Sequence, residues 1–86
     1  MNKRQRRTLA RIFGTPTRAD LSWDELASLL KALGAESRDG SGSRVKFVLD
    51  GALLSLHRPH PKPVLPKYVV EAVRAFLEER DIGPEE

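Results

Sequence analysis

The pair Asp50-Gly51 constrains the fold of this chain more than any other feature of its sequence. It separates two β-rich stretches in RVKFVLDGALLSLH, and a two-residue type I′ turn requires residues that tolerate positive φ. A hairpin built on this turn has a fixed register, because the residues on either side of the turn must pair. The predicted cross-strand pairs are Leu49 with Ala52, Val48 with Leu53, Phe47 with Leu54, Lys46 with Ser55, Val45 with Leu56, and Arg44 with His57.

The two faces of this predicted hairpin differ in character. Side chains of a strand alternate between faces, so every second pair belongs to the same surface. One face is wholly apolar, with Leu49, Phe47 and Val45 and their partners, and is expected to join the core. The opposite face becomes polar with distance from the turn and ends in Arg44 and His57. We therefore expect helices to cover the first face and a functional site to occupy the second.

Amphipathic helices are expected before and after the hairpin. The first starts at Ser22, because Ser22 and Glu25 have the spacing of a capping box, and Gly34 is placed to close it in a left-handed conformation. The other follows Pro66, which suits the first turn of a helix. Apolar residues at helical spacing form the predicted buried stripes, which are Trp23, Leu26, Ala27, Leu30 and Leu33 in one helix and Val69, Ala72, Val73, Phe76 and Leu77 in the other.

The order of these elements predicts the fold class. Residues 35–38 are expected to form a short strand before a flexible Gly- and Ser-rich turn, and residues 3–13 a short helix with Leu9, Ile12 and Phe13 on one side. The result is an α+β fold, an α-β-β-β-α sandwich with a three-stranded antiparallel sheet, two helices on one face and a short N-terminal helical extension. A basic extension over residues 1–18 and a single domain over residues 19–86 are expected.

Composition narrows the chemistry. The 86 residues include no cysteine, which excludes disulfides, thiolate zinc sites and cysteine nucleophiles. The formal charge of +3 favours an anionic partner such as nucleic acid or an acidic protein surface. No segment approaches the roughly 20 apolar residues of a membrane span, so we expect a cytoplasmic protein without a membrane partner.

Four pieces of the sequence occur in a specific order: WDELASLLKALGAE, GSGSRVKFVLDG, LHRPHP and VVEAVRAFL. In this arrangement the chain resembles the HicA family of toxins from bacterial toxin–antitoxin pairs, over nearly its whole length. The resemblance implies a fold similar to the double-stranded-RNA-binding domain in residues 19–86. It also implies ribosome-independent cleavage of mRNA, without a cofactor, and neutralisation by a HicB-like antitoxin.

One residue departs from the family's pattern. The catalytic histidine of HicA toxins follows a Gly-Ser pair on the central strand, whereas Gly42-Ser43 is followed here by Arg44. Two functions therefore stay open, both on the same fold. One is a metal-independent endoribonuclease; the other is a non-catalytic RNA-binding or protein-interaction module.

The stretch HRPHPKP, residues 57–63, holds both histidines and supplies the candidate catalytic groups. Cleavage through the ribose 2′-OH needs a base, an acid and a cation near the phosphate, and imidazole suits the first two tasks. We assign proton transfer to His57, charge stabilisation to Arg44 and a second proton transfer to His60, although His60 also fits a stiff connector or an antitoxin-facing loop. A metal site at His57 and His60 would lack further ligands. The predicted RNA-binding residues are Lys46, Ser55, Arg58, Lys62 and Lys67.

Overall fold

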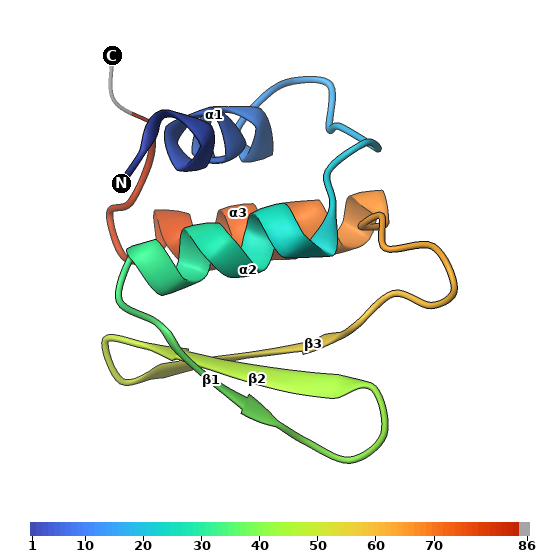
Figure 1. Cartoon of the computed structure of the whole chain (residues 1–86). Coiled ribbons are helices and arrows are strands. Elements are labelled where there is room, and N and C mark those ends of the chain that lie inside the picture. The colour runs from blue at the N-terminus through green and yellow to red at the C-terminus, as the bar shows by residue number, and fades with distance from the viewer. Residues whose placement is uncertain (85–86) are drawn as a thin grey trace.

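A computed structural model describes residues 1–84 of the chain, and Figure 1 shows its three layers. The sheet lies at the bottom of the view, α2 and α3 lie over one of its faces, and α1 lies beyond them at the top. The predicted α+β sandwich with an N-terminal helix is confirmed. The predicted division at residues 18 and 19 stays a prediction, and the last two residues of the range 19–86 lie outside the described part. The elements are α1 (Lys3–Ile12), α2 (Trp23–Ala32), β1 (Glu36–Asp39), β2 (Arg44–Leu49), β3 (Ala52–His57) and α3 (Lys67–Glu78).

The three strands form one antiparallel sheet in the order β1-β2-β3. Asp50 and Gly51 have φ values of 51° and 77°, as a type I′ turn between β2 and β3 requires. All six predicted cross-strand pairs are present, from Leu49 with Ala52 to Arg44 with His57. The apolar face of the hairpin is buried under the helices, so the predicted choice of core face is confirmed.

Helix α2 begins as its sequence predicts. The Ser22 hydroxyl accepts a hydrogen bond from the Glu25 N–H at 3.1 Å, and the Glu25 carboxylate accepts one from the Ser22 N–H at 3.0 Å. Gly34 follows the helix with a φ of 102°, which a residue with a Cβ rarely adopts. The predicted strand after it is also present, shifted by one residue to Glu36–Asp39.

The buried stripes of α2 and α3 differ from their predictions at several positions. Ala72 was predicted to be buried and is exposed, while Val70 and Leu29, which were not predicted, are fully buried. In α3 the buried residues centre on Val73, and Ala72 lies about 100° away around the helix. Ala27 similarly lies at the edge of the α2 stripe and is half-buried. Helical periodicity predicted both buried stripes, but the residues at their edges differ from the prediction by one position.

Helix α1 is part of the same core and not a detached tail. Leu9 and Ile12 are 3% and 1% exposed and join the hydrophobic cluster shared by the helices and the sheet. The guanidinium of Arg74 in α3 donates to the carbonyl oxygen of Ile12 at 2.8 Å. No helix within residues 1–84 has the length and apolar character needed to cross a membrane.

Candidate functional site

The sheet face turned away from α2 and α3 carries two rows of polar side chains. Paired residues point to the same face, so the first row consists of Arg44 and His57 and the second of Arg38, Lys46 and Ser55. All five residues are exposed. They are called the open-face cluster below. The structure thus brings together four of the predicted site residues and adds Arg38.

The ring of His57 lies between two polar groups from the start of β2 and the turn before it. Its Nδ1 is 3.4 Å from the hydroxyl oxygen of Ser43, and its Nε2 is 3.5 Å from a terminal nitrogen of Arg44. The donor and acceptor in each contact depend on which ring nitrogen carries the proton. In the tautomer protonated on Nδ1, the ring N–H faces Ser43 and Nε2 accepts from Arg44, because arginine only donates hydrogen bonds. In that tautomer Nε2 is the atom of His57 that can accept a proton.

Backbone hydrogen bonds hold the two halves of this arrangement together. The Arg58 N–H donates to the Ser43 carbonyl oxygen, and the Gly40 N–H donates to the Arg44 carbonyl oxygen, both at 2.8 Å. A Cβ at position 40 would stand only 3.3 Å from that Arg44 oxygen, so glycine permits the close approach. The positions of Ser43 and Arg44 relative to the end of β3 are therefore fixed by main chain.

The loop formed by residues 58–66 runs along the start of α2. The Trp23 N–H donates to the Pro63 carbonyl oxygen at 2.8 Å. The guanidinium carbon of Arg58 lies 5.5 Å from the centre of the Trp23 ring, within the range of a cation–π contact. Its guanidinium thus lies against the helical layer, whereas the ring of His57 contacts Ser43 and Arg44.

Comparison with known families decides what kind of protein this architecture belongs to. Residues 23–82 match the family model described as the HicA toxin of bacterial toxin–antitoxin systems. The chain belongs to this family. The match begins at the first residue of α2, continues past the end of α3 and leaves α1 outside. No curated protein and no solved structure matches the chain. The resemblance predicted from the sequence is confirmed.

The HicA match gives the pairing of Arg44 and His57 its significance. Arg44 follows Gly42-Ser43, the pair that precedes the catalytic histidine in the family's pattern. Its cross-strand partner is His57, and their side chains meet at hydrogen-bond range. An imidazole therefore lies directly across the hairpin from the position at which the resemblance predicts the catalytic histidine.

The other predicted site residues of this HicA-family chain lie outside the open-face cluster. His60 and Lys62 are exposed on the loop after β3, and Lys67 is the exposed first residue of α3. Within residues 1–84 the hydrogen bonds of the His57 ring go to Ser43 and Arg44, and not to His60. The same residues contain no group of three or more His, Asp or Glu side chains arranged to hold a metal ion.

Two members of the site were missed as functional residues. Arg38 was within the predicted first strand, but the four-residue Gly40–Ser43 turn gave no fixed register between that strand and β2. The observed pairing of Arg38 with Lys46 supplies the register. Ser43 entered the sequence analysis only as part of the Gly42-Ser43 pair before Arg44. Its position before Arg44 in a hairpin of known register was the signal that could have placed it near His57.

Proposed function

We propose that this protein is the toxin of a type II toxin–antitoxin system and acts in the cytoplasm as a ribosome-independent mRNA endoribonuclease. A HicB-like antitoxin neutralises it. The observation that carries the proposal is the contact between His57 and Arg44, one strand across from the position of the family's catalytic histidine. The proton-transfer group has moved to the neighbouring strand, while the exposed sheet face remains the place of reaction.

The proposed cleavage step uses the tautomer of His57 that carries its proton on Nδ1. Its Nε2 accepts the proton of a ribose 2′-OH, whose oxygen attacks the adjacent phosphorus and displaces the 5′ oxygen of the next nucleotide. The products are a 2′,3′-cyclic phosphate and a 5′-hydroxyl. Ser43 accepts the Nδ1–H and thereby orients the ring. On RNA binding, the Arg44 guanidinium turns from Nε2 to a phosphate oxygen and stabilises the negative charge that develops there.

The other site residues are proposed to contact the RNA on either side of the cleaved phosphate. Lys46, Ser55 and Arg38 lie in the next row and contact the phosphate or sugar beside the cleaved one. His60 is assigned the proton for the leaving 5′ oxygen. The rim residues extend the path of the RNA toward α3, and they are Arg58, Lys62 and Lys67.

The antitoxin is expected to cover the same face. Beyond the polar rows, Val48 and Leu53 form the next cross-strand pair, and Leu53 is 57% exposed. An exposed leucine beside a group of cations suits a partner with carboxylates around an apolar contact. Such a partner removes the site from RNA by occupying it.

The test is cleavage of a long mRNA by purified, antitoxin-free protein in EDTA, with an all-deoxy oligonucleotide as control. The expected result is cleavage of RNA alone, with cyclic-phosphate ends. Salt-sensitive RNA binding without cleavage would instead support a non-catalytic RNA-binding module. The observation that favours that second function is Arg44 in the place of the family's histidine.

A further inference from the structure

The exposed side of α1 is a second basic surface, outside the residues that match the HicA model. Lys3, Arg6 and Arg7 are exposed and have the i, i+3, i+4 spacing that brings side chains onto one side of a helix. These three residues are called the α1 basic face. Two other arginines have carboxylate partners, since Arg11 forms ion pairs with Asp20 and Glu25, and Arg18 forms one with Asp20. The charges of the α1 basic face have no carboxylate partner among the described residues.

These charges are placed where they do not stabilise the helix. The N-terminal end of a helix carries a partial positive charge, which favours acidic side chains and disfavours basic ones. Helix α2 follows this rule, with Asp24 and Glu25 in its first turn. Helix α1 has no acidic residue in its first turn and begins with Lys3 and Arg4. The dipole therefore does not account for Lys3, and Arg6 and Arg7, beyond the first turn, form no ion pair within residues 1–84 that would stabilise the helix.

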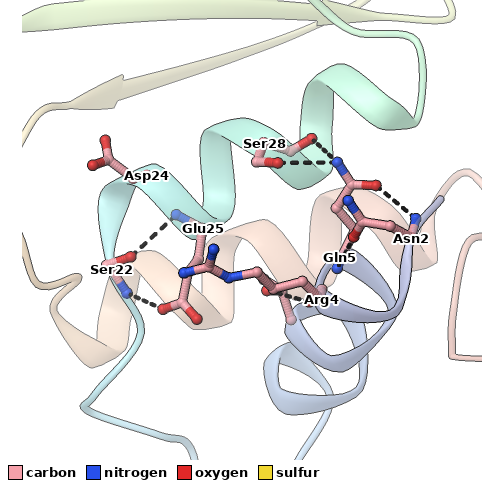
Figure 2. Close-up of a pocket in the computed structure, with 8 residues that line it drawn as sticks. Asn2, Arg4, Gln5, Ser22, Asp24, Glu25 and Ser28 are labelled. Atoms are coloured by element: carbon pink, nitrogen blue, oxygen red, sulfur yellow. Dashed lines mark hydrogen bonds between the residues drawn. The ribbon is translucent and has the colours of Figure 1, made fainter.

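The α1 basic face is held rigidly in place. Figure 2 shows the side of α1 that faces α2, where the Gln5 side chain donates to the Ser28 hydroxyl at 3.0 Å. At the other end of α1, Arg11 forms an ion pair with Glu25 at 3.1 Å. Because α1 packs on the helical layer opposite the sheet, the α1 basic face and the open-face cluster cannot contact the same phosphate (Figure 1).

Charge and the lack of apolar surface together define the partner. Apart from Lys3, Arg4, Arg6 and Arg7, the exposed residue of α1 is Ala10, and Met1 before the helix is 42% exposed. Protein interfaces are built around a larger apolar or aromatic centre than these two residues provide, whereas cations alone bind phosphate backbones. Arg4 is set apart from the other three, since Figure 2 shows it along the cleft between α1 and α2, in the direction of Glu25.

We propose that the α1 basic face binds phosphates of the RNA substrate at a distance from the cleavage site. The proposal rests on the proposed ribonuclease function for the identity of its ligand. Contacts this far from the reacting phosphate strengthen substrate and transition state equally, so they lower KM and leave kcat unchanged. The N-terminal helix thus adds affinity for long RNA to a family domain that already holds the reactive groups.

The test compares two variants that remove charge from α1 and its surroundings. The first is K3Q/R6Q/R7Q, which removes the α1 basic face. The control is R4Q/K31Q, which removes one charge from the cleft and one from the exposed Lys31 of α2. Binding of a single-stranded RNA is measured at several salt concentrations, with both variants and their parent carrying H57A to prevent cleavage. Cleavage kinetics are measured with His57 intact.

The expected result is weaker binding by K3Q/R6Q/R7Q, with the slope of log K against log salt reduced by about 0.7 for each phosphate that the variant no longer binds. KM rises and kcat stays the same. For each charge removed, R4Q/K31Q reduces this slope less than K3Q/R6Q/R7Q does. The charge-conserving variant R6K/R7K keeps the parental slope. The Tm of K3Q/R6Q/R7Q is not below that of the parent, because Lys3 opposes the helix dipole and no ion pair of these three residues within residues 1–84 is lost.

Three outcomes would overturn the proposal. An unchanged slope in K3Q/R6Q/R7Q would show that α1 does not bind RNA and would leave its charges to an acidic protein partner. An equal effect per charge in R4Q/K31Q would show that net charge alone matters. A fall in kcat would show that α1 acts through the catalytic site. The variant R44Q/K46Q separates the two proposals: if it loses RNA binding while K3Q/R6Q/R7Q keeps it, only the inference on α1 fails.

Discussion

The open-face cluster and the α1 basic face are both exposed and basic, yet they differ in what they contain. The open-face cluster combines cations with an imidazole and two hydroxyl groups, since Ser43 and Ser55 lie beside or within it. The α1 basic face contains cations alone. Cations are enough to bind a phosphate chain, whereas its cleavage also requires a group that transfers protons. Under the two proposals, the open-face cluster binds and cleaves RNA, whereas the opposite side of the molecule only binds it.

The two surfaces also differ in the contacts that hold their side chains in position. The main chain sets the position of His57 relative to Arg44, because both residues are paired strand residues. The α1 basic face is positioned instead by side-chain packing of Leu9 and Ile12 against the helical layer. The first arrangement depends on local sequence near one turn, and the second on contacts between distant parts of the chain. Substitutions at each place should therefore have separable effects.

The largest effect is expected from His57→Ala. It removes the group proposed to accept the 2′-OH proton, so kcat should fall by about 10²–10⁴-fold while RNA affinity changes little. Single-turnover cleavage and an RNA-binding titration measure the two quantities. Ser37→Ala is the control, because Ser37 is exposed on β1 and has no role in the assigned site. A full rate in His57→Ala would remove the chemical difference between the two surfaces.

The next effect concerns the anchoring of α1. Ile12 is 1% exposed and packs in the shared core, so Ile12→Ala should lower the free energy of unfolding by about 2–5 kcal/mol. Urea denaturation followed by circular dichroism measures it. Ala10→Ser, on the exposed side of the same helix, should change stability by less than about 0.5 kcal/mol. A small effect of Ile12→Ala would mean that the α1 basic face is not held in a fixed position.

The smallest effect is on the pH dependence of stability. The Ser22 backbone N–H donates to the Glu25 carboxylate and is the main cause of a lowered pKa for Glu25, with further contributions from the Ser22 hydroxyl and Arg11. A carboxyl group whose pKa is lower in the folded state stabilises the fold above its unfolded pKa, near 4.5. That stabilisation is lost as the pH falls below this value.

Glu25→Gln should therefore reduce the loss of stability between about pH 5 and pH 3, and cost less than about 1 kcal/mol at pH 7. Thermal unfolding at a series of pH values measures both. Asp24→Asn removes a carboxylate from the same turn and serves as the control. If the pH dependence of stability is the same in Glu25→Gln and the parent, neither the capping box with Ser22 nor the ion pair with Arg11 lowers the pKa of Glu25.

The accuracy of the sequence predictions follows the distance over which each feature is determined. The register from Leu49–Ala52 to Arg44–His57 was predicted fully, because Asp50-Gly51 fixes it within a few residues. The pairing of Arg38 with Lys46 was not predicted, since a flexible turn separates the strands. The burial of Val70 was missed because a neighbouring helix, and not the helical period alone, sets the edge of a stripe.

The candidate site shows the same limit. The approach of His57 to Arg44 followed from the hairpin register. The contact of the His57 ring with Ser43 did not, because it depends on how the turn before β2 folds back. The position of the Arg58 side chain was not predicted either, because it depends on how the loop after β3 packs against Trp23. Local rules thus predict which side chains share a face, and tertiary contacts decide which of them meet.

The hydrogen bond from Arg74 to the Ile12 carbonyl oxygen has a consequence for how the protein is made. It joins residues that are 62 positions apart, so α1 leaves the ribosome long before its partner on α3 exists. The contacts of α1 with α2, such as Gln5 with Ser28, can form early, whereas its contact with Arg74 has to wait for nearly the whole chain. We therefore expect nascent chains to hold α1 through α2 alone at first and to complete its docking only near the end of synthesis.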